Sequence, residues 1–269
     1  MRDLTAPALI DGLTLVVSQA AAEILRIAGS VLTVREKSDA TPVTHADEAA
    51  ESILLEGISK LLPDLEIVSE EKVARGIPCK PEGTFILVDP LDGTREILAG
   101  RDEYTINVAI IHRGRPIVGL LAAPARSLVW RGAPGYFAER LTLRPGDGVD
   151  RAQKRQPIRI RSISGQPVAL VSRSHLDSET ERFLSRWPNV EKKPCGSALK
   201  FGLLAQGDAD VYPRLSPTSE WDIAAGDAIL TAAGGMVVTP GGEPVIYGPR
   251  SGDYRVPAFI AWGDASARK

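Results

Sequence analysis

The chain has 269 residues, of which 43% are hydrophobic and 25% are charged, as is ordinary for a globular protein with one large domain or two coupled halves. Its 32 basic and 34 acidic side chains nearly cancel, which gives no electrostatic footprint for nucleic acid or for an anionic membrane. Aromatic residues make up only 5%, so no base-stacking surface is expected either.

The first 29 residues predict an amphipathic helix that packs in the core. Their apolar positions recur at helical spacing, at Leu9, Ile10, Leu13, Val16, Val17, Ile24 and Leu25. Asp3, Pro7, Asp11 and Glu23 interrupt the stretch, so it has neither the core of a signal peptide nor an uninterrupted span for a bilayer. We therefore expect no transmembrane segment.

A second helix and a run of strands are predicted next. The helix covers residues 44–61, and strands are expected at 66–69 and at 84–89, the latter formed by the apolar run "TFILV" and the aspartate that follows it. The remaining β-forming stretches of this part are 103–111, 116–125, 127–132 and 135–138. The segment 139–157 is polar and rich in turn residues, which indicates a boundary between two halves.

Beyond this boundary, helices and strands alternate. Strands are predicted at 168–172, 209–212, 236–239 and 257–262, and helices at 178–187, 197–207 and 221–235. The last helix ends at the stop signal Gly234–Gly235. We predict layered α and β structure with a mixed sheet in each half, the halves being residues 1–150 and 151–269.

Short acidic motifs stand where predicted strands end or helices begin. They are Asp47 in "THAD", Glu70 and Glu71 in "VSEE", Asp89 and Asp92 in "DPLDGT", and Asp222 in "EWD". Hard cations such as Mg²⁺ bind carboxylate and carbonyl oxygens, so carboxylates from several strand ends would suit such an ion. No cluster of histidine and cysteine competes in the sequence, which disfavours zinc.

Each acidic motif also has a purely structural explanation. Asp47 follows Thr44 by three residues, as in a capping box, and Asp222 in the first turn of a helix favours the helix dipole. Glu70 and Glu71 are typical of a solvated strand exit. "DPLDGT" is harder to explain in this way, because a turn does not require two carboxylates directly after an apolar strand.

Three ordered blocks, "EE", "DPLDGT" and "WDIAAGDAILTAAGG", resemble the signature blocks of the inositol monophosphatase superfamily of lithium-sensitive, Mg²⁺-dependent phosphatases. Together they cover most of the chain. The resemblance implies a layered α-β-α-β-α sandwich of the inositol monophosphatase and sugar phosphatase type. It also implies that the metal site lies in the cleft between the two halves.

The resemblance implies a role for each residue of the motifs. Two Mg²⁺ ions, with a weaker third in the usual description of the family, would be bound by Glu70, Asp89, Asp92, Asp222 and the carbonyl of Leu91. Asp47 and Thr94, together with Glu70, would orient or deprotonate the attacking water. Gly93 would let the backbone pass close to the phosphate, and the amides of Gly93 and Thr94 would bind it. Glu70, Leu91, Asp92 and Asp222 would also contact the substrate.

Two longer stretches, "REKSDATPVTHAD" and "GSALKFGLLAQGDADVYPRLSPTSEWD", are similar to segments of the 3'(2'),5'-bisphosphate nucleotidase branch. A substrate with two phosphates needs a cationic site for the phosphate that is not cleaved. Lys200 and Arg214 are the candidates for it, with Ser197 as a hydroxyl donor and His175 near the nucleotide. The alternatives are an exposed helical position for Lys200, a loop charge for Arg214 and a loop or cap role for His175.

The rival function within the superfamily is that of an inositol monophosphatase. Those enzymes generally place a glutamate seven residues before the aspartate of "WD", where this chain has Leu215 beside Arg214. This difference favours a nucleotidase that removes the 3'-phosphate of 3'-phosphoadenosine 5'-phosphate, a by-product of sulfur metabolism. A module that binds phosphate esters without catalysis is a further alternative, which the intact set of Glu70, Asp89, Asp92, Thr94 and Asp222 opposes.

The two cysteines, Cys79 and Cys195, form no CxxC motif and favour a reducing compartment. No motif equips Cys195 with a base, so it is interpreted as a small buried hydrophobe and not as a nucleophile. The expected location is the cytoplasm, with peripheral attachment to the inner face of the membrane as the alternative. The expected partner is a bisphosphorylated nucleotide and not nucleic acid, and a homodimer is compatible with the resemblance.

Overall fold

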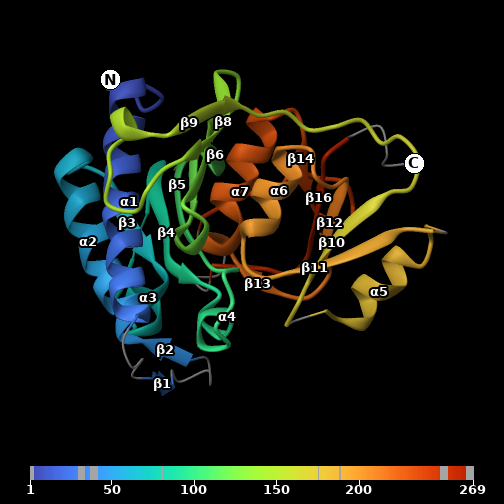
Figure 1. Ribbon diagram of the computed structural model, residues 1–269, viewed down its shortest axis with the longest axis horizontal. Coiled ribbons are helices and arrows are strands. Elements are labelled where there is room, and N and C mark those ends of the chain that lie inside the picture. The colour runs from blue at the N-terminus through green and yellow to red at the C-terminus, as the bar shows by residue number, and fades with distance from the viewer. Residues whose placement is uncertain are drawn as a thin grey trace.

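The computed structural model describes residues 3–29, 34–36, 42–79, 81–174, 176–187, 189–248 and 254–264. Helices and sheets alternate in five layers, which confirms the predicted α-β-α-β-α sandwich (Figure 1). Two outer helices cover a seven-stranded sheet, two central helices separate it from a five-stranded sheet, and one short helix covers the far side. The cavity described below lies where the central layers meet.

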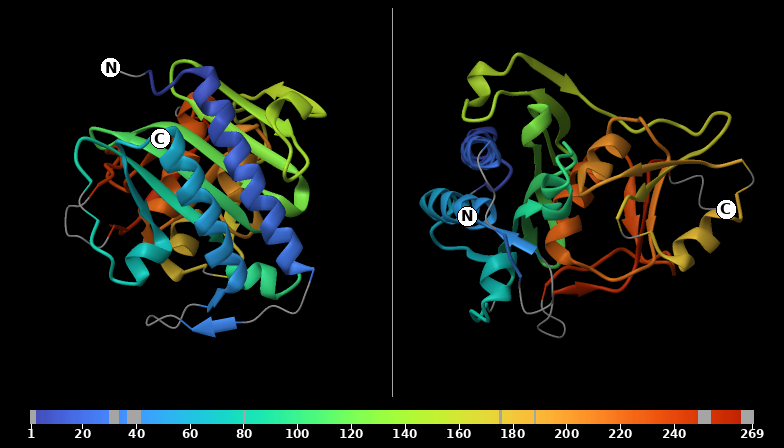
Figure 2. Two further views of the ribbon diagram at one scale, coloured as in Figure 1. Left: turned by 90° about the vertical axis from the view of Figure 1, so that its left-hand side faces the viewer. Right: turned by 60° about the horizontal axis from the view of Figure 1, so that its bottom comes forward.

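The first layer consists of α1 (Pro7–Ala28) and α2 (His45–Leu61), which lie across one face of the larger sheet (Figure 2). Pro7 opens α1 at the first helical position, where its missing N–H is not needed. Among the described residues, α1 is the one helix long and apolar enough to cross a membrane, but 56% of its most apolar window is buried inside the protein. The prediction of an amphipathic core helix is confirmed by this burial.

The seven-stranded sheet has its strands in chain order. They are β3 (Glu66–Ser69), β4 (Thr84–Asp92), β5 (Thr105–His112), β6 (Arg115–Ala123), β7 (Leu128–Ala133), β8 (Phe137–Thr142) and β9 (Lys154–Pro157). Only β3 and β4 pair in parallel, and the other neighbours are antiparallel. The register of β4 against β5 shifts between Asp89 and Asp92, as at a β-bulge, so β4 continues three residues past its predicted end.

The segment predicted as a boundary contributes to this sheet. It contains the end of β8, a short 3₁₀ turn at Val149–Arg151 and β9, which pairs with β8. The larger sheet therefore extends past residue 150, to Pro157. Helices from beyond this boundary also pack against the larger sheet. The division of the chain at residue 150 stays a prediction.

The central layer holds α6 (Leu199–Ala205) and α7 (Glu220–Ala232), and α5 (Ser178–Leu184) forms the outer layer. The five-stranded sheet between them has the order β11 (Glu191–Cys195), β10 (Val168–Ser172), β12 (Val211–Arg214), β16 (Phe259–Trp262) and β14 (Met236–Val238). Strands β10, β11 and β12 are parallel, whereas β16 runs antiparallel to β12 and β14. One continuous apolar cluster joins α6 and α7 to both sheets.

Small elements complete the fold around the cavity. They are the strand pairs β1 (Val34–Glu36) with β2 (Pro42–Thr44) and β13 (Thr218–Ser219) with β15 (Arg255–Val256), the short helices α3 (Glu70–Ala74) and α4 (Thr94–Leu98), and a 3₁₀ turn at Pro124–Arg126. Helix α3 follows β3 directly and α4 follows β4 after Gly93. Two predicted acidic motifs thus stand at neighbouring strand ends of one sheet.

Candidate active site

A cavity of about 350 Å³ gathers side chains from both halves of the chain. Ten residues predicted as site residues line it, namely Glu70, Asp89, Leu91, Asp92, Gly93, Thr94, Ser197, Lys200, Arg214 and Asp222. Asp47 contacts this group through Thr94. His175 lies outside the residues that the structure describes. The cavity therefore unites the acidic and the cationic residues that the sequence had singled out.

Asp89 and Asp92 at the end of β4 line the cavity, and the chain changes direction directly after them at Gly93. Asp89 is buried, and its Oδ1 accepts a hydrogen bond from the amide of Leu91 at 3.0 Å. Gly93 then has a φ of 97°, in the left-handed region that favours glycine. A Cβ at this position would lie 3.1 Å from the carbonyl oxygen of Glu103 and 3.2 Å from the Cβ of Ser197. Glycine is thus required for both the turn and the close packing.

Asp47 has two functions at the start of α2. Its Oδ2 accepts hydrogen bonds from the amide and the hydroxyl of Thr44, at 2.7 and 2.6 Å, which confirms the predicted capping box. Its Oδ1 faces the cavity residue Thr94, whose hydroxyl donates to it at 3.2 Å. Capping the helix therefore leaves one carboxylate oxygen of Asp47 to orient Thr94, and its catalytic role stays a prediction.

The two glutamates after β3 differ in their exposure. Ser69 caps α3 by accepting a hydrogen bond from the amide of Lys72 at 3.3 Å. Glu70 lines the cavity, whereas Glu71 is buried with 5% of its surface exposed. The alternative of a solvated strand exit is therefore wrong for Glu71.

Asp92 and Asp222 bring two negative charges together across the cavity. Asp222 caps α7, where its Oδ2 accepts hydrogen bonds from the amide of Ser219, at 3.1 Å, and from the hydroxyl of Thr218. Burial raises the pKa of Asp92, and the nearby charge of Asp222 raises this pKa further, while Lys200 partly offsets both effects. A bound cation would relieve the repulsion between these carboxylates.

The donor set fits a hard divalent cation in chemical type. Carboxylate and carbonyl oxygens line the acidic side of the cavity, and Mg²⁺ prefers such oxygen ligands. In the described part of the chain, no three histidine, cysteine or acidic side chains converge closely enough to form a ready-made site. Several carboxylates are instead hydrogen-bonded to the backbone and to hydroxyl groups.

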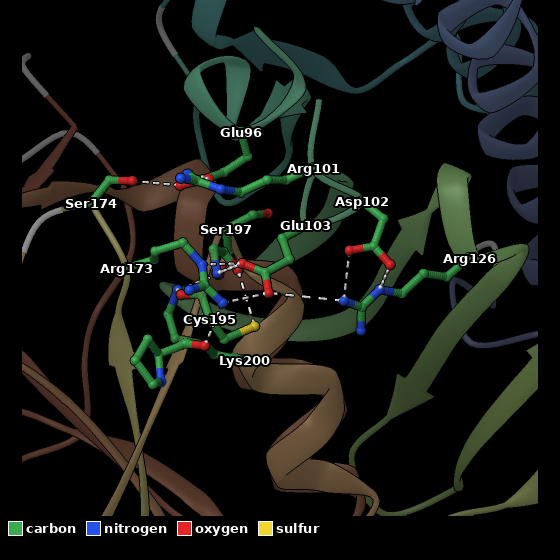
Figure 3. A network of polar contacts seen from close by, with 12 residues as sticks. Glu96, Arg101, Asp102, Glu103, Arg126, Arg173, Ser174, Cys195, Ser197 and Lys200 are labelled. Carbon is green, nitrogen blue, oxygen red and sulfur yellow. Dashed lines mark hydrogen bonds and ion pairs between the residues drawn. The ribbon is translucent and has the colours of Figure 1, made fainter. Parts of the chain in front are cut away.

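Lys200 is buried, with only 2% of its surface exposed, so the alternative of an exposed helical residue is wrong. Its Nζ donates to the carbonyl oxygens of Cys195 and Ser197, at 3.0 and 2.5 Å (Figure 3). The same atom lies 4.9 Å from the centre of the Tyr212 ring. Because a lysine ammonium has three N–H groups, one is left for a further acceptor.

Arg214 ends β12 at the cavity wall. Its Nη2 donates to the carbonyl oxygen of Pro217 at 3.3 Å, while its buried Nε has no hydrogen-bond partner among the described residues. A buried donor without an acceptor is costly, so an anion in the cavity would be stabilised here. The adjacent Leu215 packs against an apolar cluster that includes Val171 and Leu184.

Several cavity residues were missed by reasoning from the sequence, namely Arg95, Glu96, Ser172, Ser174, Tyr212, Thr218, Ser219, Trp221 and Arg255. Ser172 is the last residue of β10 and Ser174 lies two residues further on, and ligands commonly bind at the carboxyl ends of parallel strands. That rule could have identified these two serines. The others are ordinary helix, strand or turn residues, whose neighbours in space cannot be read from the sequence.

Cys195 is poorly suited to nucleophilic attack. Both cysteines are free, and burial raises the pKa of the Cys195 thiol to about 11. The reactive thiolate is therefore scarce near neutral pH. This agrees with its interpretation as a small buried hydrophobe.

The fold and the acidic cavity define a phosphatase class, and comparison with known proteins specifies it. A sequence profile of the inositol monophosphatase family matches residues 9–262, so the chain belongs to that family. A Salmonella typhimurium protein named 3'(2'),5'-bisphosphate nucleotidase CysQ is 39% identical over 214 residues, which cover 80% of this chain and 82% of the relative. The protein of the same name from Escherichia coli K12 is 36% identical over 217 residues, covering 81% and 84%.

Solved structures agree with this family assignment. A crystal structure of CysQ from Bacteroides thetaiotaomicron, described as a bacterial member of the inositol monophosphatase family, matches with a TM-score of 0.77 and 30% identity over 97% of this chain and 99% of that chain. An inositol monophosphatase from Anabaena, with 23% identity and a TM-score of 0.73 over 96% and 91% of the chains, shares the fold. The predicted superfamily and branch are thus confirmed.

Proposed function

We propose that this chain is a Mg²⁺-dependent phosphatase that removes the 3'-phosphate of 3'-phosphoadenosine 5'-phosphate, giving AMP and phosphate. Relatives named 3'(2'),5'-bisphosphate nucleotidase support the activity, since they align over about four fifths of each chain. The observation that carries the substrate assignment is the meeting of acidic and cationic side chains in one cavity. Two free cysteines support a reducing compartment, the cytoplasm, as its location.

The acidic side of the cavity would hold the cations. Glu70, Asp89, Asp92, Asp222 and the carbonyl oxygen of Leu91 are the proposed ligands for two Mg²⁺ ions, or three as in the usual description of the family. When bound, the ions would supply an activated water and neutralise charge on the phosphate. The fit rests on the oxygen donors that line the cavity and on the mutual repulsion of Asp92 and Asp222.

Thr94 and Asp47 are proposed to orient the attacking water. The Thr94 hydroxyl donates a hydrogen bond to Asp47 Oδ1, so the oxygen of Thr94 can accept a hydrogen bond from water. Glu70, which also lines the cavity, is the proposed partner that takes up the water proton. The amides of Gly93 and Thr94 are the proposed contacts for the phosphate that is cleaved.

The cationic side would bind the phosphate that is retained. Arg214 Nε has no hydrogen-bond partner among the described residues, and Lys200 has one N–H left. Ser197 also lines the cavity, where its hydroxyl donates to Asp92. An inositol ring would instead need a carboxylate for its hydroxyl groups. Leu215 cannot supply one, because its apolar side chain packs away in a hydrophobic cluster. The cavity thus favours a bisphosphate over an inositol monophosphate.

Phosphate release in the presence and absence of Mg²⁺ tests the proposal. The substrates are 3'-phosphoadenosine 5'-phosphate, inositol 1-phosphate and fructose 1,6-bisphosphate, and Asp92→Asn serves as the inactive control. We expect release from the nucleotide only with Mg²⁺, and a loss of at least about 100-fold in Asp92→Asn. If the wild-type chain releases no phosphate from any of the three, the enzyme proposal is wrong and a binding module remains.

A further inference from the structure

The turn between β11 and α6, residues 195–198, holds the Asp92 carboxylate. Ser197 Oγ and the amide of Ala198 donate to Asp92 Oδ2 at 2.9 and 2.6 Å. Ser197 has a φ of 55°, a left-handed conformation that is costly for a residue other than glycine. Such a conformation persists only when surrounding groups fix it, so the contacts that hold this turn determine how Asp92 is presented.

Glu103 lies in the loop before β5, in the N-terminal half of the chain, and contacts the turn, which lies in the C-terminal half. Its Oε2 accepts a hydrogen bond from the amide of Gly196 at 2.8 Å. The fit is close, since a Cβ at Gly196 would lie 2.8 Å from the Glu103 carbonyl oxygen. Only 13% of the Glu103 side chain is exposed, so this charged acceptor is shielded from water and its hydrogen bond is stronger than one at the surface.

Arg173 fixes the Glu103 carboxylate in turn. Its Nε and Nη2 donate to the two carboxylate oxygens at 2.7 and 2.8 Å, and its Nη2 also donates to the carbonyl oxygen of Pro194 at 2.8 Å. Figure 3 shows Arg173 and Arg126 approaching Glu103 from different sides, with Arg126 at 4.0 Å. Glu103 is thus held by a bidentate ion pair with Arg173, and Arg173 lies in the same half of the chain as the turn.

A separate contact supports the turn from the larger sheet. The hydroxyls of Thr105 and Ser197 lie 2.5 Å apart. Because the Ser197 hydroxyl donates to Asp92, the Thr105 hydroxyl is the donor to Ser197 Oγ. This contact fixes the Ser197 side chain, whereas Glu103 fixes the preceding backbone amide. Lys200 binds carbonyl oxygens of the same turn. Glu103 is therefore a charged anchor for the turn that comes from the opposite half.

We propose that Glu103 is a positioning residue for phosphate hydrolysis, which acts by holding the turn at residues 195–198 so that Asp92 is presented to the metal. The inference rests on the proposed function, in which Asp92 binds the cation. Glu103 does not line the cavity and so contacts neither substrate nor metal. Its loss is expected to affect cation binding and kcat while leaving KM nearly unchanged, because displacement of a catalytic group by about 1 Å can reduce the rate by about 100-fold.

The test compares Glu103→Ala and Glu103→Gln with Asp102→Ala. Asp102 is a suitable control because it is the neighbouring acidic residue and also pairs with an arginine, Arg126, but has no hydrogen bond to the turn. Binding of Mn²⁺, which accepts oxygen ligands like Mg²⁺, is measured without substrate by electron paramagnetic resonance of the free ion. Steady-state kinetics then give kcat and KM at saturating Mg²⁺.

Glu103→Ala should lower kcat by about 10- to 100-fold and weaken Mn²⁺ binding by about 10-fold, with KM within about twofold of wild type. Glu103→Gln, which keeps an acceptor for the Gly196 amide but loses the ion pair, should fall between, and Asp102→Ala should match wild type. If folded Glu103→Ala has the same kcat and the same Mn²⁺ binding as Asp102→Ala, the inference is overturned. If Glu103→Ala does not fold, unchanged Mn²⁺ binding and kcat in Glu103→Gln overturn it instead.

These outcomes separate the inference from the proposed function. A wild-type chain without phosphatase activity would contradict the function, whereas Mn²⁺ binding by the Glu103 variants would still report on the turn. An active wild type with unaffected Glu103 variants would contradict only the role of Glu103.

Discussion

Arg214 lies at the wall of the cavity, where its buried Nε–H has no hydrogen-bond acceptor in the described part of the chain. A charged hydrogen bond contributes about 1.5–3 kcal/mol, so an anion bound here would gain a comparable amount. We expect Arg214→Ala to lower kcat/KM for 3'-phosphoadenosine 5'-phosphate by about 10- to 100-fold. The value for inositol 1-phosphate, which has no second phosphate, should stay within about twofold. Steady-state kinetics with both substrates check this expectation.

A matched control for this change is Arg182→Ala on α5. Arg182 pairs with Glu179 on the outer helix, its side chain is 64% exposed, and it does not line the cavity. It should leave both kinetic values unchanged. An equal loss on both substrates in Arg214→Ala would show that Arg214 supports the site in general and does not recognise a second phosphate.

Asp227 is a fully buried carboxyl group on α7 whose pKa is raised to about 6. Burial is the cause, while hydrogen bonds from Tyr247 and Thr231 and the charge of Arg115 partly oppose it. Because the folded-state pKa exceeds the ordinary 3.8, the contribution of this group to stability is fully present below pH 3.8 and is lost as pH rises through about 6.

Asp227→Asn should therefore gain stability relative to wild type as pH rises. The pKa difference between about 6 and 3.8 corresponds to roughly 3 kcal/mol as an upper limit, since an amide keeps the acceptor for Tyr247 but changes the hydrogen bond with Thr231. Urea unfolding at several values between pH 4 and pH 7 measures the difference in unfolding free energy. A difference that stays constant over this range would contradict the assignment of the raised pKa to Asp227.

Helix α7 lies against the larger sheet over glycines. A Cβ at Gly119 on β6 would lie 2.2 Å from the backbone carbonyl oxygen of Ala225, and one at Gly132 on β7 would lie 3.1 Å from the Cα of Ile229. A backbone neighbour cannot rotate away, so these positions set the distance between helix and sheet. Because α7 begins at Glu220 and carries Asp222, this packing also places one side of the cavity.

Gly119→Ala is expected to lower the unfolding free energy by roughly 1–3 kcal/mol or more, because α7 must shift to admit the methyl group. Thermal unfolding measures the loss. Gly241→Ala is the control, since Gly241 lies in an exposed turn where a Cβ would meet nothing closer than 3.6 Å. Equal melting temperatures for the two variants would mean that the contact between α7 and β6 is not tight.

The type and order of the main elements followed from apolar periodicity, but their ends did not. Helix α1 and strand β3 match the prediction because their patterns are strong and local. Strand β4 continues to Asp92 through an irregular register with β5, which depends on the partner strand and not on β4 itself. Helix α5 ends at Leu184, short of the predicted residue 187, and β9 lies in the segment expected to be a boundary between two halves.

At the scale of the whole molecule, the acidic motifs indicated the cavity, but the contacts that support it could not be predicted. Asp92 is held by Ser197 and Ala198, which lie 105 and 106 positions further along the chain. Glu103 gives no signal in the sequence, because Arg173 and Gly196 lie 70 and 93 positions away. The burial of Lys200 likewise depends on α6 lying between two sheets. Such contacts result from the assembly of the layers.

The central claim is that the cavity recognises a bisphosphorylated nucleotide and hydrolyses its 3'-phosphate. The most direct measurement compares kcat/KM for 3'-phosphoadenosine 5'-phosphate and inositol 1-phosphate at saturating Mg²⁺, with the nucleotide product identified by phosphorus NMR. We predict a preference for the nucleotide of at least about 10-fold, as a charged contact to the second phosphate would give, and AMP as the product. Equal or better hydrolysis of inositol 1-phosphate, or release of adenosine 3'-phosphate, would contradict the account.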